Sequence, residues 1–457
     1  MPRSSAWTTH FAPLARRAAL PAALLAAAAC VSTVKRPPAP PRPAPSDTAR
    51  PGAPSDTAAP PIENVPPPPE RELEGERVVR IALSTTASHV TLTSTGDWRL
   101  YDSGGESTLL RADDHALWTI EARGGKLRAI GEDGDATPFR PAPFIARTVA
   151  RGAFVAVNGK RYRGEVWVIP DGDRVMVVNR LYLEDYLRGV VPLEIGHRAP
   201  GEEAAVRAQA VAARSYAYTH LSPERRYDMV STVMDQVYGG VNAETPISDD
   251  AVRATAGLVL TYDGRVVNAP YYSTCGGSTA AASEVWHEGD EPYLVPVSDR
   301  IPGTDHYYCD ISPRFSWTRT FSAHALREVL DRYLRQYARV HGKIGTPREV
   351  KVDGRTASGR VRRLVITTDR GRYTLTGNDI RFVLRQASGE ILQSTSFSVE
   401  AEHGRGGALT SLVLRGTGYG HGIGMCQWGA IGRARAGFDY RTILRTYYPG
   451  TVVAHVD

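Results

Sequence analysis

The segment that most constrains the fold is an alanine-rich helix predicted over residues 201–221. Small alanines surround it and valines fill the gaps between them: Ala204, Ala205, Val206, Ala208, Ala210, Val211, Ala212 and Ala213. A helix that is apolar on nearly every face is buried, so the chain must build a core around it. The polar exceptions Arg207, Gln209 and Arg214 each need a partner in that core.

Residues 78–180 consist of short runs that alternate apolar and polar side chains, separated by Gly, Asp and Ser clusters. This pattern is typical of strands and hairpins, and Asn158-Gly159 is a hairpin turn signal. Further helices are predicted over 249–255, capped by Ser248, over 321–339, capped by Ser322, and near 427–436. The expected class is therefore α+β, with a β-rich N-terminal region over about 78–180 and a mixed helix and strand core over about 181–457.

The N-terminus predicts export. Residues 1–30 carry arginines followed by an apolar run that is too short to span a membrane. Small residues stand directly before Cys30, as at a lipoprotein cleavage site where the cysteine is lipidated; the alternative is a plain secretory signal cut near Ala29. Residues 31–74 are rich in Pro and Ala and predict an extended linker. We expect the protein in the cell envelope, held to a membrane by a lipid anchor.

Composition narrows the class of partner. The net charge of +6 is mild for 457 residues and is spread along the chain, so nucleic acid is not the expected partner. Tyrosine is the main aromatic residue, 21 against 9 phenylalanines. Its flat apolar face and hydroxyl suit polar polymers such as sugars, although a β-rich fold also accommodates many tyrosines.

Three segments carry candidate chemistry. Residues 190–221 place Glu194 among apolar neighbours, directly before the alanine-rich helix. Residues 271–299 and 416–437 are polar and glycine-rich, and each contains a tryptophan. Taken singly, each has an ordinary interpretation, since Glu194 could cap or salt-bridge the helix and glycine loops are common. Together in one exported chain, they favour a glycan-binding groove with one general acid.

The same segments resemble the SpoIID/LytB family of sporulation stage II protein D and its amidase-enhancer relatives. The resemblance rests on "YLRGVVPLEI" with "EEAAVRAQAVAARSYA", on "YYSTCGGSTAAASEVW" with "PYLVPVSD", and on "GYGHGIGMCQWGAIGRARAGFDYRTILRTYYPGT". It spans roughly residues 75–455, so we expect one family-like domain over 75–457. The resemblance implies activity on peptidoglycan glycan strands, in this family often strands without stem peptides.

Sporulation members of that family are lytic transglycosylases, and the resemblance implies that Glu194 corresponds to their catalytic acid. Most glycosidases need two carboxylates. A lytic transglycosylase needs one, because the C6 hydroxyl of muramic acid is the nucleophile and a 1,6-anhydro sugar results. The apolar neighbours Val191, Pro192, Leu193 and Ile195 are expected to raise the pKa of Glu194. The alternative is a non-catalytic amidase enhancer that binds glycan and stimulates a cell-wall amidase.

The predicted groove wall combines polar side chains with glycines that allow close approach of a ligand. Its members are Arg214, Tyr216, Ser273, Gly276, Gly277, Thr279, His421, Gln427 and Trp428. For each of these residues singly, a structural role is an equal alternative.

No cofactor is required by this chemistry, but the cysteines leave a choice. A disulfide between Cys275 and Cys309 is favoured in an oxidising compartment. Some sporulation members bind zinc, and the resemblance therefore offers Cys275, His306 and Cys309, with His287 nearby, as alternative ligands. Cys426 is expected to be a buried free thiol.

Overall fold

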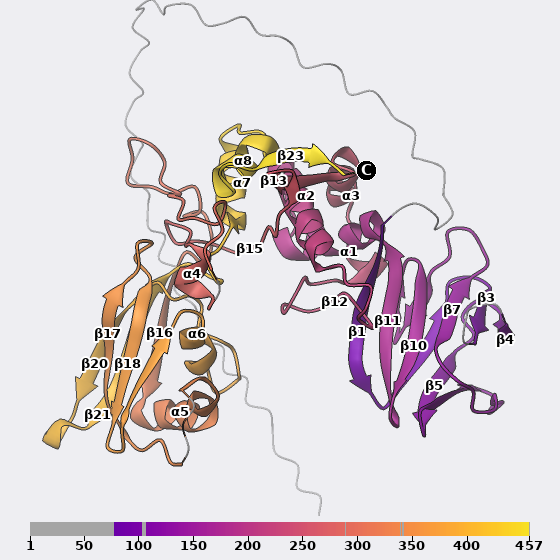
Figure 1. The fold of residues 1–457 in the computed structure, drawn as a ribbon, viewed down its shortest axis with the longest axis horizontal. Coiled ribbons are helices and arrows are strands. Elements are labelled where there is room, and N and C mark those ends of the chain that lie inside the picture. Colours follow the sequence, from indigo (N-terminus) through magenta and orange to yellow (C-terminus); the bar gives the residue numbers. More distant parts are fainter. Residues whose placement is uncertain (1–76, 103–106, 288, 339, 341, 457) are drawn as a thin grey trace, which may run out of the picture. The chain divides into compact units, whose positions relative to one another are not determined.

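The computed structural model describes residues 77–102, 107–287, 289–338, 340 and 342–456, and they belong to one compact unit within Glu70–Asp457. The predicted signal peptide, the predicted lipidation site at Cys30 and the linker predicted at 31–74 lie outside the described residues. The expected α+β class is confirmed, and Figure 1 shows the strands and helices of this unit. Among the described residues, no helix has both the length and the apolar character that a membrane-spanning helix needs.

The N-terminal region is made of strands, as its alternating pattern predicts. They are β1 (Val78–Ala87), β2 (His89–Ser94), β3 (Trp98–Tyr101), β4 (Thr108–Ala112), β5 (Trp118–Arg123), β6 (Lys126–Gly131), β7 (Phe144–Thr148), β8 (Val155–Val157), β9 (Lys160–Tyr162), β10 (Glu165–Asp171) and β11 (Arg174–Tyr182). With β12 (Met229–Val230), they form a sheet in the order β12-β1-β11-β10-β7-β3-β4 and a second sheet in the order β6-β5-β2-β8-β9.

Helices and short strands follow β11. They are α1 (Leu183–Ile195), α2 (Glu203–His220), the 3₁₀ turn η1 (Gly240–Ala243), α3 (Pro246–Ala254), β13 (Leu258–Tyr262), β14 (Arg265–Val266), β15 (Tyr271–Tyr272) and α4 (Ala282–Val285). The chain ends with β22 (Met425–Cys426), α7 (Gln427–Arg435), α8 (Tyr440–Tyr447) and β23 (Val452–His455). A small sheet joins β14, β13 and β23, and β15 pairs with β22.

Residues 316–417 form a module with a hydrophobic core of its own. It contains β16 (Ser316–Ser322), α5 (Ala323–Ala338), β17 (Pro347–Arg355), β18 (Val361–Thr368), β19 (Arg372–Thr376), α6 (Asp379–Val383), β20 (Phe397–His403), η2 (Arg405–Gly407) and β21 (Leu409–Thr417). Its two three-stranded sheets have the orders β16-β21-β20 and β17-β18-β19, and α5 packs on both. This module was not predicted as separate from the rest of the core over 181–457.

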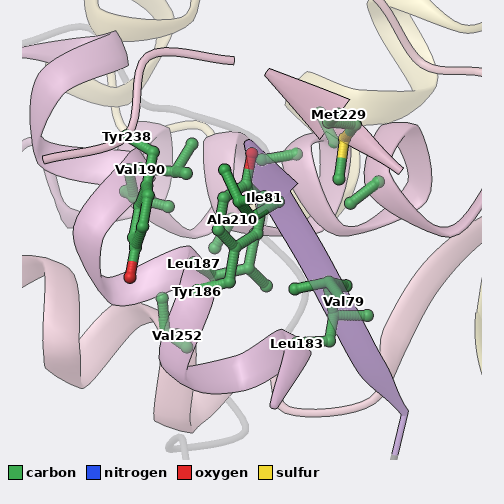
Figure 2. Close-up of a cluster of buried hydrophobic side chains, with 14 of the residues drawn as sticks. Val79, Ile81, Leu183, Tyr186, Leu187, Val190, Ala210, Met229, Tyr238 and Val252 are labelled. Atoms are coloured by element: carbon green, nitrogen blue, oxygen red, sulfur yellow. The ribbon is translucent and has the colours of Figure 1, made fainter. Parts of the chain in front are cut away.

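The alanine-rich helix is buried as predicted, and it contacts α1, α3, α7, α8 and β13. Figure 2 shows part of the apolar cluster around it, which includes Val79 and Ile81 of β1, Tyr186 and Val190 of α1 and Ala210 of α2. Because many side chains of α2 are single methyl groups, these four helices can pack closely against it. This cluster fixes the position of α1, and therefore of Glu194 near its C-terminal end.

One helix was not predicted from the sequence, and one was predicted with other bounds. No helix was assigned to the segment before the alanine-rich helix, and Glu194 lies there in the last turn of α1. Packing stabilises α1 despite Pro192 in its interior. The helix predicted over 249–255 begins earlier, at Pro246, because Thr245 is its N-cap and accepts from the backbone N–H of Ser248. Ser248 instead completes a capping box.

Candidate functional site

The Glu194 carboxyl group is half-buried at the end of α1 and is held from two sides. Its Oε1 accepts the backbone N–H of Val237 at 2.7 Å. The side-chain amide of Gln427, the first residue of α7, also hydrogen-bonds the carboxyl group. Glu194 thus lies where the chain after β12 meets the start of α7.

Burial raises the pKa of Glu194 to about 7, and the hydrogen bonds from Val237 and Gln427 only partly oppose this increase. Burial disfavours the charged form of a carboxyl group, whereas donors favour it. The group is therefore close to half protonated at neutral pH, which suits a residue that both gives and accepts a proton.

The apolar residues that flank Glu194 in the sequence do not all surround its side chain. Val191, Pro192 and Ile195 are buried as expected, but Leu193 is 45% exposed. Successive helix residues point in different directions, so they cannot all surround one side chain. Tyrosines of α1, α2 and β15 lie close enough for the negative charge of Glu194 to raise their pKa values, in addition to the larger effect of burial. They are Tyr186, Tyr216 and Tyr271.

A network of amides and hydroxyls fixes these tyrosines. Gln236 donates to the hydroxyl of Tyr271 at 2.8 Å and to the carbonyl of Ala213 at 3.2 Å, and it accepts from the hydroxyl of Tyr186 at 3.2 Å. The hydroxyl of Tyr216 donates to Asp235 at 3.4 Å. Asp235, Gln236 and Tyr271 were not among the site residues predicted from the sequence, although the polar pair Asp235-Gln236 within the run "TVMDQVYGG" was a usable signal.

The parallel pairing of β15 with β22 brings the second and third segments together. Tyr271 pairs with Met425 and Tyr272 with Cys426, and the backbone N–H of Trp428 donates to the carbonyl of Ser273 at 3.0 Å. Gln427 also donates to the side-chain oxygen of Gln209 of α2 at 3.2 Å, whereas the side-chain nitrogen of Gln209 is buried without a partner among the described residues. Ser273, Gln427 and Trp428 therefore lie in the same neighbourhood as Glu194.

Arg198 is a further candidate that the sequence analysis missed. Its guanidinium lies 5.2 Å from the centre of the Trp428 ring and contacts Glu202 at 3.7 Å. Glu202 is buried and is held by Arg435 of α7. This ties the loop after Glu194 to α7 and presents a cation on an aromatic face, four residues after the candidate acid in the sequence.

Other predicted wall residues have structural roles. Arg214 is fully buried and donates twice to Glu184, at 2.7 Å each. Thr279 is buried, accepts the backbone N–H of Val297 at 2.7 Å and donates to the carbonyl of Val295. Neither side chain is accessible to a ligand in this structure.

His421 supports the loop rather than acting in proton transfer. One ring nitrogen accepts the backbone N–H of Ile423 at 3.1 Å, and the other donates to the carbonyl of Tyr271 at 3.0 Å. Burial, together with the charges of Arg381 and Arg360, lowers its pKa to about 3. The ring is therefore neutral at physiological pH.

The glycines allow close approach between loops and not only to a ligand. Gly276 has a φ of 70°, and a Cβ there would lie 2.6 Å from the backbone nitrogen of Gly418. Gly277 faces the ring of Tyr307. At Gly422, a Cβ would meet the buried guanidinium of Arg360 at 2.6 Å. A side chain at Gly276 would separate the two glycine-rich segments, and one at Gly422 would displace Arg360.

The cysteines do not follow the expected disulfide. Cys275, Cys309 and Cys426 are free and buried, and the sulfur atoms of Cys275 and Cys309 lie 3.3 Å apart, well beyond the roughly 2 Å of a disulfide bond. The two histidines of the alternative ligand set lie on the surface. His306 pairs with Asp310 at 2.9 Å, and His287 with Asp379 at 3.0 Å.

A cleft of about 650 Å³ is found elsewhere, in the module of residues 316–417. Arg319, Tyr333 and Gln393 are among its lining residues, and none of the contacts of Glu194 contributes to it. The chemistry of Glu194 therefore does not depend on this cleft.

Two family models match the chain. Residues 171–262 match the model described as Stage II sporulation protein, which covers Glu194 and α2. Residues 302–424 match a domain of unknown function (DUF8618), and this range contains the module with its own core.

Three curated proteins are similar over most of the chain. An uncharacterized protein of Brachyspira hyodysenteriae is 29% identical over 82% of this chain and 92% of its own length. The amidase enhancer of Bacillus subtilis is 32% identical over 74% of this chain, which spans half of that protein. Stage II sporulation protein D of Bacillus subtilis is 30% identical over 61% of this chain and 76% of its own length.

Proposed function

Since the chain belongs to the SpoIID/LytB family of stage II sporulation protein D and the amidase enhancer, we propose that it is a lytic transglycosylase of peptidoglycan. Its substrate is the glycan strand, cleaved between N-acetylmuramic acid and N-acetylglucosamine. The observation that carries the proposal is a carboxyl group with a pKa of about 7, fixed by a backbone N–H and an amide at the junction of the three segments.

The proposed reaction uses Glu194 twice. Its protonated carboxyl group gives a proton to the glycosidic oxygen as the bond to the anomeric carbon breaks. The carboxylate then takes the proton of the C6 hydroxyl as that oxygen bonds to the anomeric carbon and closes the 1,6-anhydro ring. A pKa near neutrality allows both steps, because neither protonation state is strongly disfavoured.

A hydrolase would need a second carboxylate as base or nucleophile. Asp235 is the acid in the tyrosine network around Glu194, but both of its carboxylate oxygens already accept hydrogen bonds. Oδ1 accepts from the Tyr216 hydroxyl at 3.4 Å, and Oδ2 accepts the backbone N–H of Val230 at 2.7 Å. These bonds favour a structural role for Asp235, and they favour a reaction in which the substrate supplies the nucleophile.

Arg198 fits the proposed substrate class. A glycan strand without stem peptides carries one lactyl carboxylate on each muramic acid. The Arg198 guanidinium, supported by the Trp428 ring, is suited to pair with this group, and the ring offers a face on which a sugar can stack.

The test is to incubate the purified full chain with peptide-free glycan strands and to identify the new ends by mass spectrometry. We expect 1,6-anhydro-muramic ends, and none with the Glu194→Gln variant. Reducing ends in place of anhydro ends would identify a hydrolase and contradict the proposal.

The similarity to the amidase enhancer favours a second candidate, a glycan-binding protein that stimulates an N-acetylmuramoyl-L-alanine amidase. It predicts no cleavage by the chain alone and faster release of stem peptides when an amidase is added to intact peptidoglycan. In that case, Glu194→Gln would stimulate as well as the wild type.

The localisation follows from the sequence alone and is also a proposal. We infer that the chain is exported to the cell envelope and anchored there through a lipidated Cys30.

A further inference from the structure

Four buried side chains with metal-binding atoms lie close together where the segments 271–299 and 416–437 meet. They are Cys275, Asp299, Cys309 and Cys426, and one ligand atom from each lies within 4.8 Å of all the others. These residues come from four separate stretches of the described chain. Three sulfur atoms and one carboxylate oxygen are ligand types that zinc accepts.

The spacing fits a tetrahedral ion better than a disulfide. The sulfur of Cys275 lies 3.3 Å from that of Cys309 and 3.5 Å from Oδ2 of Asp299. Zinc bonds of about 2.3 Å to sulfur and about 2.0–2.2 Å to oxygen place neighbouring ligand atoms roughly 3.5–3.8 Å apart. A disulfide would require the two sulfurs to approach to about 2 Å and would leave Cys426 unused.

The surroundings orient the donors. The sulfur of Cys426 accepts the backbone N–H groups of Cys275 at 3.2 Å and Gly429 at 3.3 Å. Oδ1 of Asp299 is engaged by Arg433 and by the hydroxyl of Tyr447, which leaves Oδ2 directed to Cys275. Donors of this kind stabilise thiolates and fix ligand orientation around metals.

We propose that Cys275, Asp299, Cys309 and Cys426 bind one zinc-class divalent ion. The three cysteines bind as thiolates, so each thiol proton present in the metal-free site is released to solvent on binding. Three thiolates and one carboxylate around a divalent ion, beside the Arg433 guanidinium, leave a single net negative charge in the core. With four protein ligands, the site has no open position and is structural.

The ion would act on the candidate active site through one peptide bond. Cys426 is the N-cap of α7, and the next residue, Gln427, hydrogen-bonds Glu194. Fixing Cys426 therefore fixes the start of α7 and the donor to the acid. The ligand set differs from the one predicted from the sequence, because His306 is 78% exposed and pairs with Asp310, whereas Cys426 and Asp299 take part.

The test measures metal content and does not depend on the proposed activity. The full chain is purified without chelators after growth with zinc, and bound metal is measured by native mass spectrometry and elemental analysis. We expect one zinc ion per chain in the wild type and in His306→Ala. The variants Cys309→Ser and Cys426→Ser should lose most of it.

A cobalt titration of the wild-type chain covers the case in which a serine variant does not fold. Thiolate-to-cobalt charge-transfer bands together with strong visible bands of tetrahedral cobalt would support the proposal, and octahedral spectra would contradict it. A metal-free chain lighter by two hydrogen atoms than its reduced form would reveal a disulfide. A metal-free chain with three alkylatable thiols would reveal free cysteines. Either result would overturn the inference.

Discussion

The backbone N–H of Val237 donates to Oε1 of Glu194 across 2.7 Å. This bond fixes a carboxyl group from α1 against a segment that follows β12, and Gln427 holds it from α7. The geometry of the candidate acid therefore depends on α1, on the segment after β12 and on α7. Substitutions in these elements can test its position, its pKa and its surroundings separately.

Replacing Glu194 by Gln should stabilise the protein at alkaline pH. The folded-state pKa of about 7 lies above the ordinary value of 4.5, so the folded state holds a proton that the unfolded state loses. The resulting stability is complete below pH 4.5 and is lost as the pH rises to about 7. At pH 8, Glu194→Gln should raise the unfolding free energy by up to about 3 kcal/mol. Denaturant unfolding at pH 4 and pH 8 checks this; equal stabilities at pH 8 would place the carboxyl group in water.

Removing the amide of Gln427 should shift the pH profile of the proposed activity upward. The Gln427 hydrogen bond lowers the pKa of Glu194, so its loss in Gln427→Leu raises that pKa while the site stays dry. Activity that needs protonated Glu194 would then persist to higher pH. The profile of kcat/KM against pH measures the shift, and Gln336→Leu on the exposed face of α5 is the control. An unchanged midpoint of the pH profile would show that Gln427 does not affect the pKa of Glu194.

Replacing Arg214 by Met should destabilise the fold and leave substrate affinity unchanged. The guanidinium is fully buried against Glu184 and also donates to the carbonyl of Leu258. The side chain of Glu184 is 33% exposed and stays partly solvated, so the loss of the hydrogen bonds of the guanidinium should cost about 1–3 kcal/mol. Arg207→Met on the same helix is the matched control, because Arg207 is only half-buried. A raised KM with unchanged stability would instead return Arg214 to the groove wall.

Arg198→Ala should weaken binding of peptide-free glycan. If the guanidinium pairs with the lactyl carboxylate, the loss is on the order of 1–3 kcal/mol, or about 5- to 150-fold in KM. Arg198→Lys should recover part of it, since the charge remains but the stacking on Trp428 is weakened. Kinetics with glycan whose carboxylates are amidated give the control: there, wild type and Arg198→Ala should be alike.

Cys30→Ala should release the protein from the membrane fraction. Lipidation at Cys30 is the proposed anchor, and fractionation together with mass spectrometry of the mature N-terminus tests it. A wild-type N-terminus that begins near Ala29 without lipid would identify the plain secretory signal.

The elements that the sequence predicted well are those with strong local patterns. The alanine-rich helix was expected over 201–221 and spans Glu203–His220, and the last glycine-rich segment leads into a helix that begins at Gln427 as expected. The position of Glu194 was harder to predict. Its helix α1 contains valines and Pro192, which disfavour a helix locally, and packing against β1 and α2 decides the outcome.

Contacts between residues that lie far apart in the sequence could not be predicted from local sequence patterns either. Nothing in the composition of either segment predicts that Tyr272 pairs with Cys426, because backbone pairing is set by the assembled fold. The same reason explains why Arg214, a polar residue on a buried helix, was assigned to the groove. The sequence showed that it needed a partner, and only the fold identified Glu184.

The methyl-lined surface of α2 limits how this site can change. Alanines on a shared axis cannot adjust by choosing another rotamer, so a larger residue at Ala208 or Ala212 must push whole helices apart. Such a push would move α1 and α7 together with Glu194 and Gln427. Variation in substrate preference is therefore expected in exposed loops such as the one that carries Val233 and Met234, and not along the central axis.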